Sequence, residues 1–287
     1  MAGGARKPTG GRTTPTALTI AGSDSGGGAG IQADLKAFAR CGVHGMSAIT
    51  AVTAQSTVGV SAIHPLPAEI VLAQVREVVA DIGVDAVKVG MLGTVEVTRA
   101  VARALDELPA GTPVVVDPVM VAESGARLLE PRAQRTLIEE ILPRATVLTP
   151  NVPEARVLAG EPGGQSAEED EEAEAEALAL AVLALGPRIV VLTGGHRPSA
   201  EDLFVDSASP EAVVRIGGVR HRDGAAHGSG CTHSSVLAAQ LALGRSPLQA
   251  ARTAREMAGA AVANGLRDVG AGPGPVDVID LDRMRRM

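Results

Sequence analysis

A glycine-rich stretch at residues 223–235 has the residue types of an anion-binding loop. Gly228, Ser229 and Gly230 carry little side-chain bulk, so their backbone N–H groups can approach an oxyanion closely. An apolar helical pattern follows them, and Gly244 stands where a C′ glycine would end that helix. A helix N-terminus carries about half a positive charge. The stretch therefore predicts an anion hole, residues 228–230, for a transferring phosphoryl group.

Cys231 follows this loop and falls in the first predicted turn of the helix. The field of a helix N-terminus lowers the pKa of a thiol, which makes Cys231 a candidate base beside the phosphoryl group. The alternative interpretation of the same residues is a glycine turn followed by a core helix with an inert, buried Cys.

The elements that must position this loop alternate between short apolar strands and amphipathic helices. Strands are predicted at 17–22, 46–54, 86–91, 114–118, 146–149 and 189–192, with two weaker ones at 203–205 and 213–216, and residues 55–60 as a polar loop or flap. This order predicts an α/β fold with a mostly parallel sheet and helices on both faces. We expect one domain over residues 17–287 after a disordered tail at residues 1–16.

Ligands of such sheets bind beyond the carboxyl ends of the strands. The polar residues that follow the predicted strands fall at these ends, which a purely structural protein would not require. They are Asp24, Gln55, Asp117, Asn151, Glu154 and Thr193.

The amino-acid composition of the chain argues against several classes of function. The chain is 45% hydrophobic but 1% aromatic, so its core must be aliphatic and a planar ligand cannot rely on Trp or Tyr stacking. A net charge of −7 argues against nucleic-acid binding, which needs a basic face. No apolar run is long enough to span a membrane, and the first sixteen residues lack the apolar core of a signal peptide. The two Cys fit a reducing compartment, so we expect a cytoplasmic protein.

The sequence argues against two other phosphate-binding motifs. Residues 28–33 match a loose dinucleotide-binding fingerprint, but no acidic residue lies between Asp34 and Glu69 to hold the ribose. No Gly-Lys-Ser/Thr sequence follows a glycine loop, which excludes a Walker A motif.

Seven ordered sequence blocks together resemble the hydroxymethylpyrimidine/phosphomethylpyrimidine kinases of thiamine biosynthesis, which belong to the ribokinase-like superfamily. The blocks are residues 17–24, 26–36, 53–56, 88–92, 117–120, 149–155 and 227–232. The resemblance implies a three-layer α/β/α sandwich and a kinase that uses ATP and Mg²⁺. It implies phosphorylation of 4-amino-5-hydroxymethyl-2-methylpyrimidine to the monophosphate and then the diphosphate, and a homodimer by analogy. The alternatives are a pyridoxal or pyridoxine kinase and a pyrimidine-binding protein without catalysis.

The resemblance also implies roles for single residues. Gln55 offers a hydrogen-bond donor and an acceptor side by side, as an aminopyrimidine edge requires; a loop-capping amide is its alternative role. Asp34 would line the same pocket or be an exposed acid on the first helix. Glu154 would hold Mg²⁺, directly or through water, with Asn151; alternatively the two residues are an N-cap and a first-turn acid. The remaining implied residues are Gly22, Asp24, Ala29, Thr53 and Met91 for the pyrimidine, and Asp117, Thr193 and Gly195 for the nucleotide phosphates.

Several residues depart from the pattern of this family. Cys231 takes the place of the Asp base found in many superfamily kinases, as it does throughout this family. Ser229 replaces the usual Thr and keeps the hydroxyl, whereas Ala126 replaces an acid. Thr193 stands where many relatives carry a Lys, which removes a charge that would face a phosphate. Arg127 or Arg197 is expected to replace it.

Overall fold

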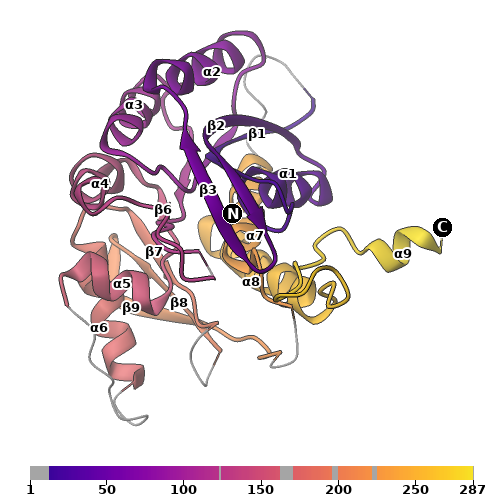
Figure 1. Ribbon diagram of the computed structural model, residues 1–287. Helices are drawn as coiled ribbons and strands as arrows, with labels where there is room; N and C mark the ends of the chain where they lie inside the picture. Colours follow the sequence, from indigo (N-terminus) through magenta and orange to yellow (C-terminus); the bar gives the residue numbers. More distant parts are fainter. Residues whose placement is uncertain (1–12, 123, 162–170, 196–199, 222–224, 287) are drawn as a thin grey trace.

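A single nine-stranded sheet organises the computed structural model (Figure 1), which describes residues 13–122, 124–161, 171–195, 200–221 and 225–286. The strand order is β3-β2-β1-β4-β5-β6-β7-β8-β9. Neighbouring strands from β2 to β7 pair in parallel, and β3, β8 and β9 are antiparallel to their neighbours. The strands are β1 Thr16–Asp24, β2 His44–Ser56, β3 Gly59–Pro65, β4 Ala86–Val89, β5 Val114–Val116, β6 Val147–Leu148, β7 Ile189–Leu192, β8 Asp202–Asp206 and β9 Ser209–Ile216.

Helices cover both faces of this sheet. One face carries α1 Gly30–Arg40, α7 Ser229–Ala242 and α8 Pro247–Ala263, which pack against one another (Figure 1). The other face carries α2 Ala68–Asp81, α3 Val95–Asp106, α4 Pro131–Thr136, α5 Val152–Ala159 and α6 Glu171–Leu183. A π turn, Leu137–Ile141, and a 3₁₀ turn, Leu142–Arg144, continue α4, and α9 Leu281–Arg285 lies near the C-terminus. The predicted three-layer α/β/α architecture is therefore confirmed.

Alternation along the strands produces two separate cores. In β1, Leu18 and Ile20 pack under α2–α6, while Ala17 faces the opposite side, where α1, α7 and α8 pack. In β7, Val190 likewise packs under α2–α6, and Ile189 faces the side where α1, α7 and α8 pack. Successive side chains of a strand point to opposite faces, so a run of buried aliphatic residues serves both layers.

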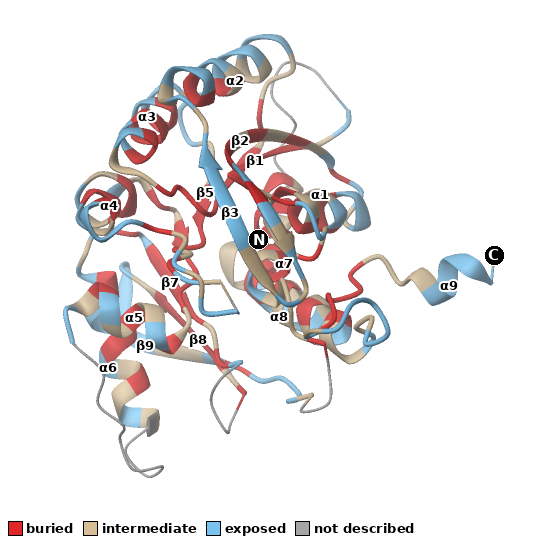
Figure 2. Cartoon of the chain, in the orientation of Figure 1, coloured by how far each residue is buried: buried red, intermediate tan, exposed pale blue. Residues whose placement is uncertain are grey.

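The region after β2 corrects the prediction. The expected flap at residues 55–60 is a β-hairpin, in which Gln55 pairs with Val60 and Ser56 with Gly59. Strand β3 is mostly exposed (Figure 2), so it lacks the apolar alternation by which strands are recognised. Strand β3 thereby forms the edge of the sheet, next to β2.

The two ends of the chain also differ from expectation. Thr16 is buried and begins β1, so it belongs to the fold rather than to the predicted tail. The glycine-proline segment after α8 packs on the tip of the β2–β3 hairpin, where Gly272 N donates to Thr57 Oγ1 at 3.2 Å. A Cβ at Gly272 would lie 2.0 Å from the Thr57 carbonyl oxygen, so only glycine fits there. None of the helices in the described ranges is long and apolar enough to cross a membrane.

Candidate active site

The predicted anion hole lies at the N-terminus of α7. Gly228 is the N-cap, with a φ of +83°, and a Cβ there would lie 1.8 Å from the Gly28 carbonyl oxygen. Both the backbone conformation and the close approach therefore require glycine. The helix ends at Ala242, and Gly244 has a φ of +77°, as the C′ prediction requires. The anion hole thus packs directly against the first glycine loop, residues 23–30.

Asp24 joins these two loops. Its carboxylate accepts the N–H groups of Gly26, Gly28 and Ala29 at 2.8, 3.0 and 2.8 Å and lies 3.1 Å from His227 Nε2. Burial raises the pKa of Asp24, but the hydrogen bonds from His227 and the backbone outweigh it and lower the pKa overall. The Asp24 carboxylate therefore stabilises the conformation of the first glycine loop. It also links this loop to His227, which directly precedes the anion hole.

Asp34 lies beneath the first glycine loop in a fully buried ion pair. Its oxygens lie 2.9 and 3.1 Å from Lys88 Nζ and accept hydrogen bonds from the hydroxyls of Thr19 and Ser235, both at 2.6 Å. Neither Asp34 nor Lys88 has exposed side-chain surface. The alternative in which Asp34 is an exposed acid is therefore wrong, and its contact with a pyrimidine stays a prediction.

Lys88 is a residue of the site that the sequence pattern did not single out. It stands in β4 between Val87 and Val89, which are completely buried. A Lys in such a strand needs a buried acid as its partner, and that requirement is the signal that could have identified the pair. Lys88 Nζ also lies 3.7 Å from Asp117 Oδ2, so it neutralises carboxylates from two elements.

The prediction that the helix field lowers the Cys231 pKa is wrong. Burial raises the pKa of the Cys231 thiol to about 12; Lys88 and the Gly30 N–H lower it, and the carboxylates of Asp117 and Asp34 raise it further. Although the residue keeps some exposed surface, burial of its thiol and the charges of the two acids leave its pKa raised. Cys231 is therefore a protonated thiol in the ligand-free protein.

Asn151 and Glu154 form a capping box at the start of α5. Asn151 Oδ1 accepts the Glu154 N–H at 2.8 Å, and Glu154 Oε2 accepts the Asn151 N–H at 3.0 Å. The N-cap alternative is thus confirmed. Burial, together with the charge of Asp117, raises the pKa of Glu154 to about 8.

Asp117 and Glu154 are two neighbouring carboxyl groups whose pKa values are both raised, an arrangement that favours a cation beside them. Asp117 is buried, and its Oδ2 accepts a 3.0 Å hydrogen bond from Ser234. Burial also raises the Asp117 pKa, against the opposing effect of Lys88. Among the described residues no group of three or more His, Cys, Asp or Glu side chains is arranged to hold a metal. Asp117 and Glu154 nevertheless fit Mg²⁺, which is commonly held by one or two carboxylates together with substrate phosphates and water.

The loop after β7 brings Thr193 beside this acidic pair. Thr193 forms an isolated parallel bridge with Asn151, and its N–H donates to the Pro150 carbonyl at 2.9 Å. The next residue, Gly194, donates to Asp202 Oδ1 at 2.8 Å. Gly195 is exposed at the end of this described segment. Of the two cations expected to replace a Lys at position 193, Arg127 is exposed on another loop and Arg197 lies outside the described residues.

The predicted pyrimidine residues fall into two neighbouring groups. Thr53 Oγ1 donates to Gln55 Oε1 at 3.2 Å, and Gln55 lines a hollow of about 410 Å³ beside Ser25. Gly22 packs on Met91, where a Cβ would lie 2.8 Å from the Met91 Sδ. The structure therefore pairs Gln55 with Thr53 and Gly22 with Met91.

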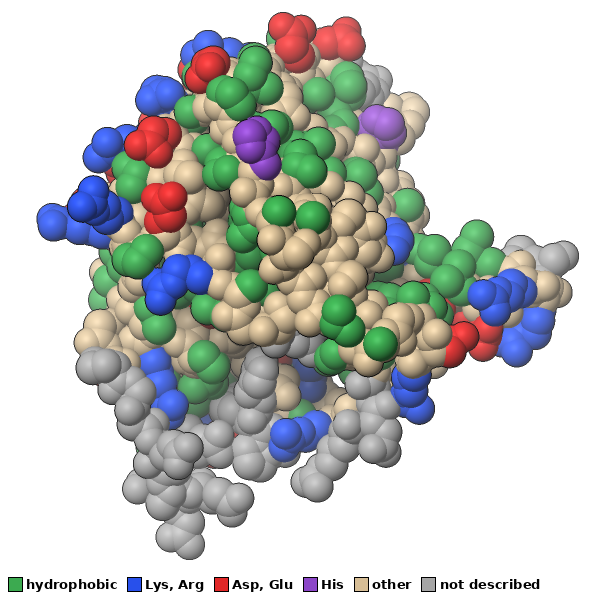
Figure 3. All heavy atoms as spheres, in the orientation of Figure 1, with side chains coloured by type: hydrophobic (Ala, Val, Ile, Leu, Met, Phe, Trp, Pro, Cys, Tyr) green, Lys and Arg blue, Asp and Glu red, His purple; other side chains and the backbone are tan. Residues whose placement is uncertain are grey.

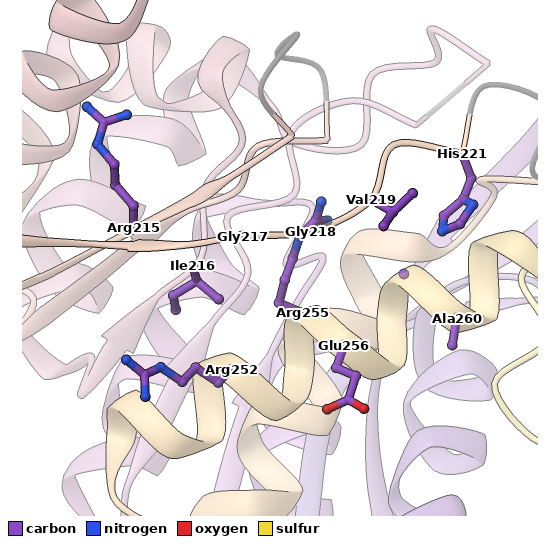
Figure 4. Close-up of a pocket in the computed structure, with 11 residues that line it drawn as sticks. Arg215, Ile216, Gly217, Gly218, Val219, His221, Arg252, Arg255, Glu256 and Ala260 are labelled. Atoms are coloured by element: carbon purple, nitrogen blue, oxygen red, sulfur yellow. The ribbon is translucent and has the colours of Figure 1, made fainter.

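A second cavity, of about 460 Å³, was not predicted (Figure 4). It lies between α8 and the segment after β9 that leads along the chain toward the anion hole. Gly217-Gly218 followed by an exposed Val219 is the sequence signal that could have pointed to it. Its lining combines small or apolar residues with cations; examples are Gly218, Val219 and Ala260 of the first kind and Arg215, Arg252 and Arg255 of the second.

Comparisons with known proteins agree with this geometry. The family model described as phosphomethylpyrimidine kinase matches residues 24–277. Hydroxymethylpyrimidine/phosphomethylpyrimidine kinases are 46% identical in Rhizobium meliloti and 47% in Streptomyces coelicolor. These matches cover 92% and 94% of this chain, and 96% of each relative.

Solved structures show the same fold. The phosphomethylpyrimidine kinase of Clostridium difficile has a TM-score of 0.71 at 37% identity, covering 85% of this chain and 97% of its own. A Staphylococcus aureus pyridoxal kinase in complex with AMP-PCP and pyridoxal has a TM-score of 0.82 at 33% identity, covering 95% and 96%. The family model and the relatives together show that this chain belongs to the phosphomethylpyrimidine kinase family.

Proposed function

We propose that this chain is an ATP-dependent kinase that phosphorylates 4-amino-5-hydroxymethyl-2-methylpyrimidine to its monophosphate and then to its diphosphate. The observation that carries the proposal is the packing of the anion hole on the first glycine loop, with Cys231 and the Asp117–Glu154 pair beside it. This arrangement supports phosphoryl transfer between two ligands, because a hollow lies beside the β2–β3 hairpin and a separate cavity lies beside α8.

The residues at the two sites suit the two ligands. The Gln55 carboxamide would bind the aminopyrimidine edge, with Gly22 and Met91 against the ring. The cavity beside α8 would take the nucleoside, with Val219 and Ala260 against the base in a chain without Trp or Tyr. Asp117 and Glu154 would hold Mg²⁺, directly or through water, and the ion would neutralise phosphate charge when bound.

Cys231 would act on the first transfer. The hydroxymethyl group must lose its proton as it attacks, and a Cys231 thiolate would accept that proton. With a pKa of about 12, the thiol has to ionise within the complex, and Lys88 is the positive charge that favours this. The phosphate monoester of the second transfer is already ionised at neutral pH, so that step needs less help from a base.

A pyridoxal or pyridoxine kinase is the second candidate. It is favoured by the TM-score of 0.82 to the Staphylococcus aureus pyridoxal kinase, above the 0.71 to the Clostridium difficile enzyme. The higher sequence identities, however, belong to the hydroxymethylpyrimidine/phosphomethylpyrimidine kinases. A protein that only binds the pyrimidine is the third candidate, and intact Cys231, Asn151 and Glu154 argue against it.

One experiment separates these candidates. Purified protein is incubated with MgATP and the hydroxymethylpyrimidine, with pyridoxine and pyridoxal in parallel, and products are identified by mass spectrometry. Successive mono- and diphosphates would establish the main proposal. A monophosphate alone, or phosphorylation of the B6 vitamers only, would favour the second candidate. No product from any acceptor would favour the third. Gln55→Leu serves as a control, since it should raise the KM of the pyrimidine without changing that of ATP.

We also propose a cytoplasmic homodimer. The two Cys are free, which fits a reducing compartment such as the cytoplasm.

The dimer is argued from the β2–β3 hairpin. It exposes Val52, Val58 and Ile63 at 47, 66 and 37%, and β3 is an edge strand. The face in Figure 3 has hydrophobic and uncharged side chains in its middle, where β3 lies, and charged ones toward its periphery. Light scattering of wild type and Ile63→Lys tests the dimer, which the variant should weaken.

A further inference from the structure

Lysines offer little positive charge for a nucleoside triphosphate in the described part of the chain. The sequence contains three Lys, of which Lys7 lies outside the described residues. Lys88 is fully buried against Asp34, and Lys36 donates to the Gly27 carbonyl at 2.7 Å in the first glycine loop. Thr193 supplies no charge at the loop after β7. The side chains left to supply a permanent positive charge to a phosphate chain on the nucleotide side, besides a bound Mg²⁺, are therefore arginines.

Asp202 connects the elements on this side. It is completely buried at the start of β8, and its Oδ1 accepts the Gly194 N–H at 2.8 Å. The same oxygen lies 3.9 Å from Arg255 Nε, and Oδ2 lies 3.1 Å from His233 Nε2. One carboxylate thus contacts the loop after β7, helix α7 and helix α8. Arg255 is thereby held close to the Thr193–Gly194 step and to the helix that carries the anion hole.

Arg255 is fixed in place and still faces the cavity. Its Nη2 donates to the Ala200 carbonyl, and its side chain is only 12% exposed. Figure 4 shows it rising from α8 to Gly218, whereas Arg252 and Glu256 leave the helix in other directions. A Cβ at Gly218 would lie 2.2 Å from Arg255 Nε, so the backbone there is shaped around the guanidinium. The buried Nε has no hydrogen-bond partner in the ligand-free protein.

We propose that Arg255 binds the phosphate chain of the donor nucleotide and supplies the charge that Thr193 lacks. A guanidinium has five donors in a rigid fork that matches phosphate oxygens, and the contacts with Asp202 and Ala200 leave donors for a ligand. Asp202 is the positioning residue that keeps this cation in register with the anion hole. The proposal rests on the nucleotide half of the proposed function.

The test measures binding of ADP and of adenosine by calorimetry to wild type, Arg255→Met and Arg245→Met. A charged hydrogen bond to phosphate is worth roughly tenfold or more in affinity. Arg255→Met should therefore weaken ADP binding by at least about tenfold and leave adenosine binding within about twofold. Arg245 is exposed just before α8 and does not line the cavity, so Arg245→Met is the control for loss of one charge and should change either affinity by less than about threefold.

Two further variants test the role of charge. Arg255→Lys keeps the ion pair with Asp202 and the fold but loses the fork, so it should lie between wild type and Arg255→Met. Adding Thr193→Lys to Arg255→Met should restore part of the ADP affinity. Thermal melting of each variant checks that it is folded.

The proposal is overturned if Arg255→Met weakens ADP and adenosine equally, since the residue would then only shape the cavity. Equal effects of Arg245→Met and Arg255→Met would also overturn it, as a general effect of charge. Neither binding measurement needs an acceptor. If the wild type makes no pyrimidine phosphate while the loss remains confined to ADP, the proposed function fails and the assignment of Arg255 stands.

Discussion

Replacing Lys88 with Met would remove one partner of a fully buried ion pair. Lys88 Nζ lies 2.9 Å from Asp34 and 3.7 Å from Asp117, and it has no exposed side-chain surface. Breaking such a pair leaves an uncompensated carboxylate and costs about 3–5 kcal/mol. In a protein of this size that loss corresponds to a fall in Tm of roughly 10 °C.

The double variant Lys88→Met with Asp34→Asn separates the ion pair from packing. Because the Asn amide can still bond the hydroxyls of Thr19 and Ser235, and only one of the two carboxylates beside Lys88 keeps its charge, the double variant should lose less stability than the two single variants added together. Urea unfolding followed by circular dichroism measures all three. Arg76→Met is the control, because its pair with Glu107 is solvent-exposed and should leave the urea midpoint unchanged.

Two results would refute this reasoning. One is a loss below about 1 kcal/mol for Lys88→Met, which would place the pair among exposed ion pairs in strength. The other is strict additivity in the double variant.

Lys88 also lowers the pKa of Cys231, so Lys88→Met should slow alkylation of that thiol at a fixed pH, measured in a Cys41→Ala background.

The remaining predictions concern the base, the metal-side acid and the anion hole. Cys231→Ala should reduce the transfer to the alcohol by ~10²–10⁴-fold and the transfer to the monophosphate less, measured separately with each acceptor; equal losses would count against the thiol as base. Glu154 has a pKa of about 8 in the folded protein and an ordinary value of 4.5. Between these two pH values the folded protein therefore keeps a proton on Glu154 that the unfolded chain has lost. The metal-free protein should therefore lose stability, by up to about 5 kcal/mol, as the pH rises from 4.5 to 8, and Glu154→Gln should flatten that slope in thermal melts. Gly228→Ala should lose more than about 3 kcal/mol, because it adds a collision with the Gly28 carbonyl to a positive φ. Gly93→Ala, with a φ of +77° and open space around it, should cost only about 1 kcal/mol. A similar cost for both would show that the collision relaxes.

The architecture was predictable because its strands are short, buried and aliphatic. Ile189–Leu192 was predicted with its correct bounds. Strand β3 was missed for the opposite reason: its side chains are mostly exposed, so hydrophobic periodicity says nothing about it. Pairing with β2, a tertiary property, decides its conformation.

The site was predictable where its chemistry is local. Gly228 and the C′ residue Gly244 follow from neighbours in sequence, as does the capping box of Asn151 and Glu154. The pKa of Cys231 was predicted in the wrong direction because only the helix dipole is visible locally, whereas Asp34 and Asp117 come from other elements. Residues such as Arg255 and His227 gain their roles from partners that no spacing rule brings together.

The contacts that close the site have a consequence for synthesis of the chain. Ser235 reaches Asp34 across 201 residues, His227 reaches Asp24 across 203, and Gly272 reaches Thr57 across 215. Sheet pairing between β1, β2 and β4 needs only the first third of the chain, but the Asp34–Lys88 pair stays uncovered until α7 leaves the ribosome. A nascent chain that stops before α7 therefore leaves apolar sheet surface beside α1 and a charged pair uncovered, the kind of exposed surface that favours aggregation. The catalytic centre can therefore be completed only after α7 has been synthesised.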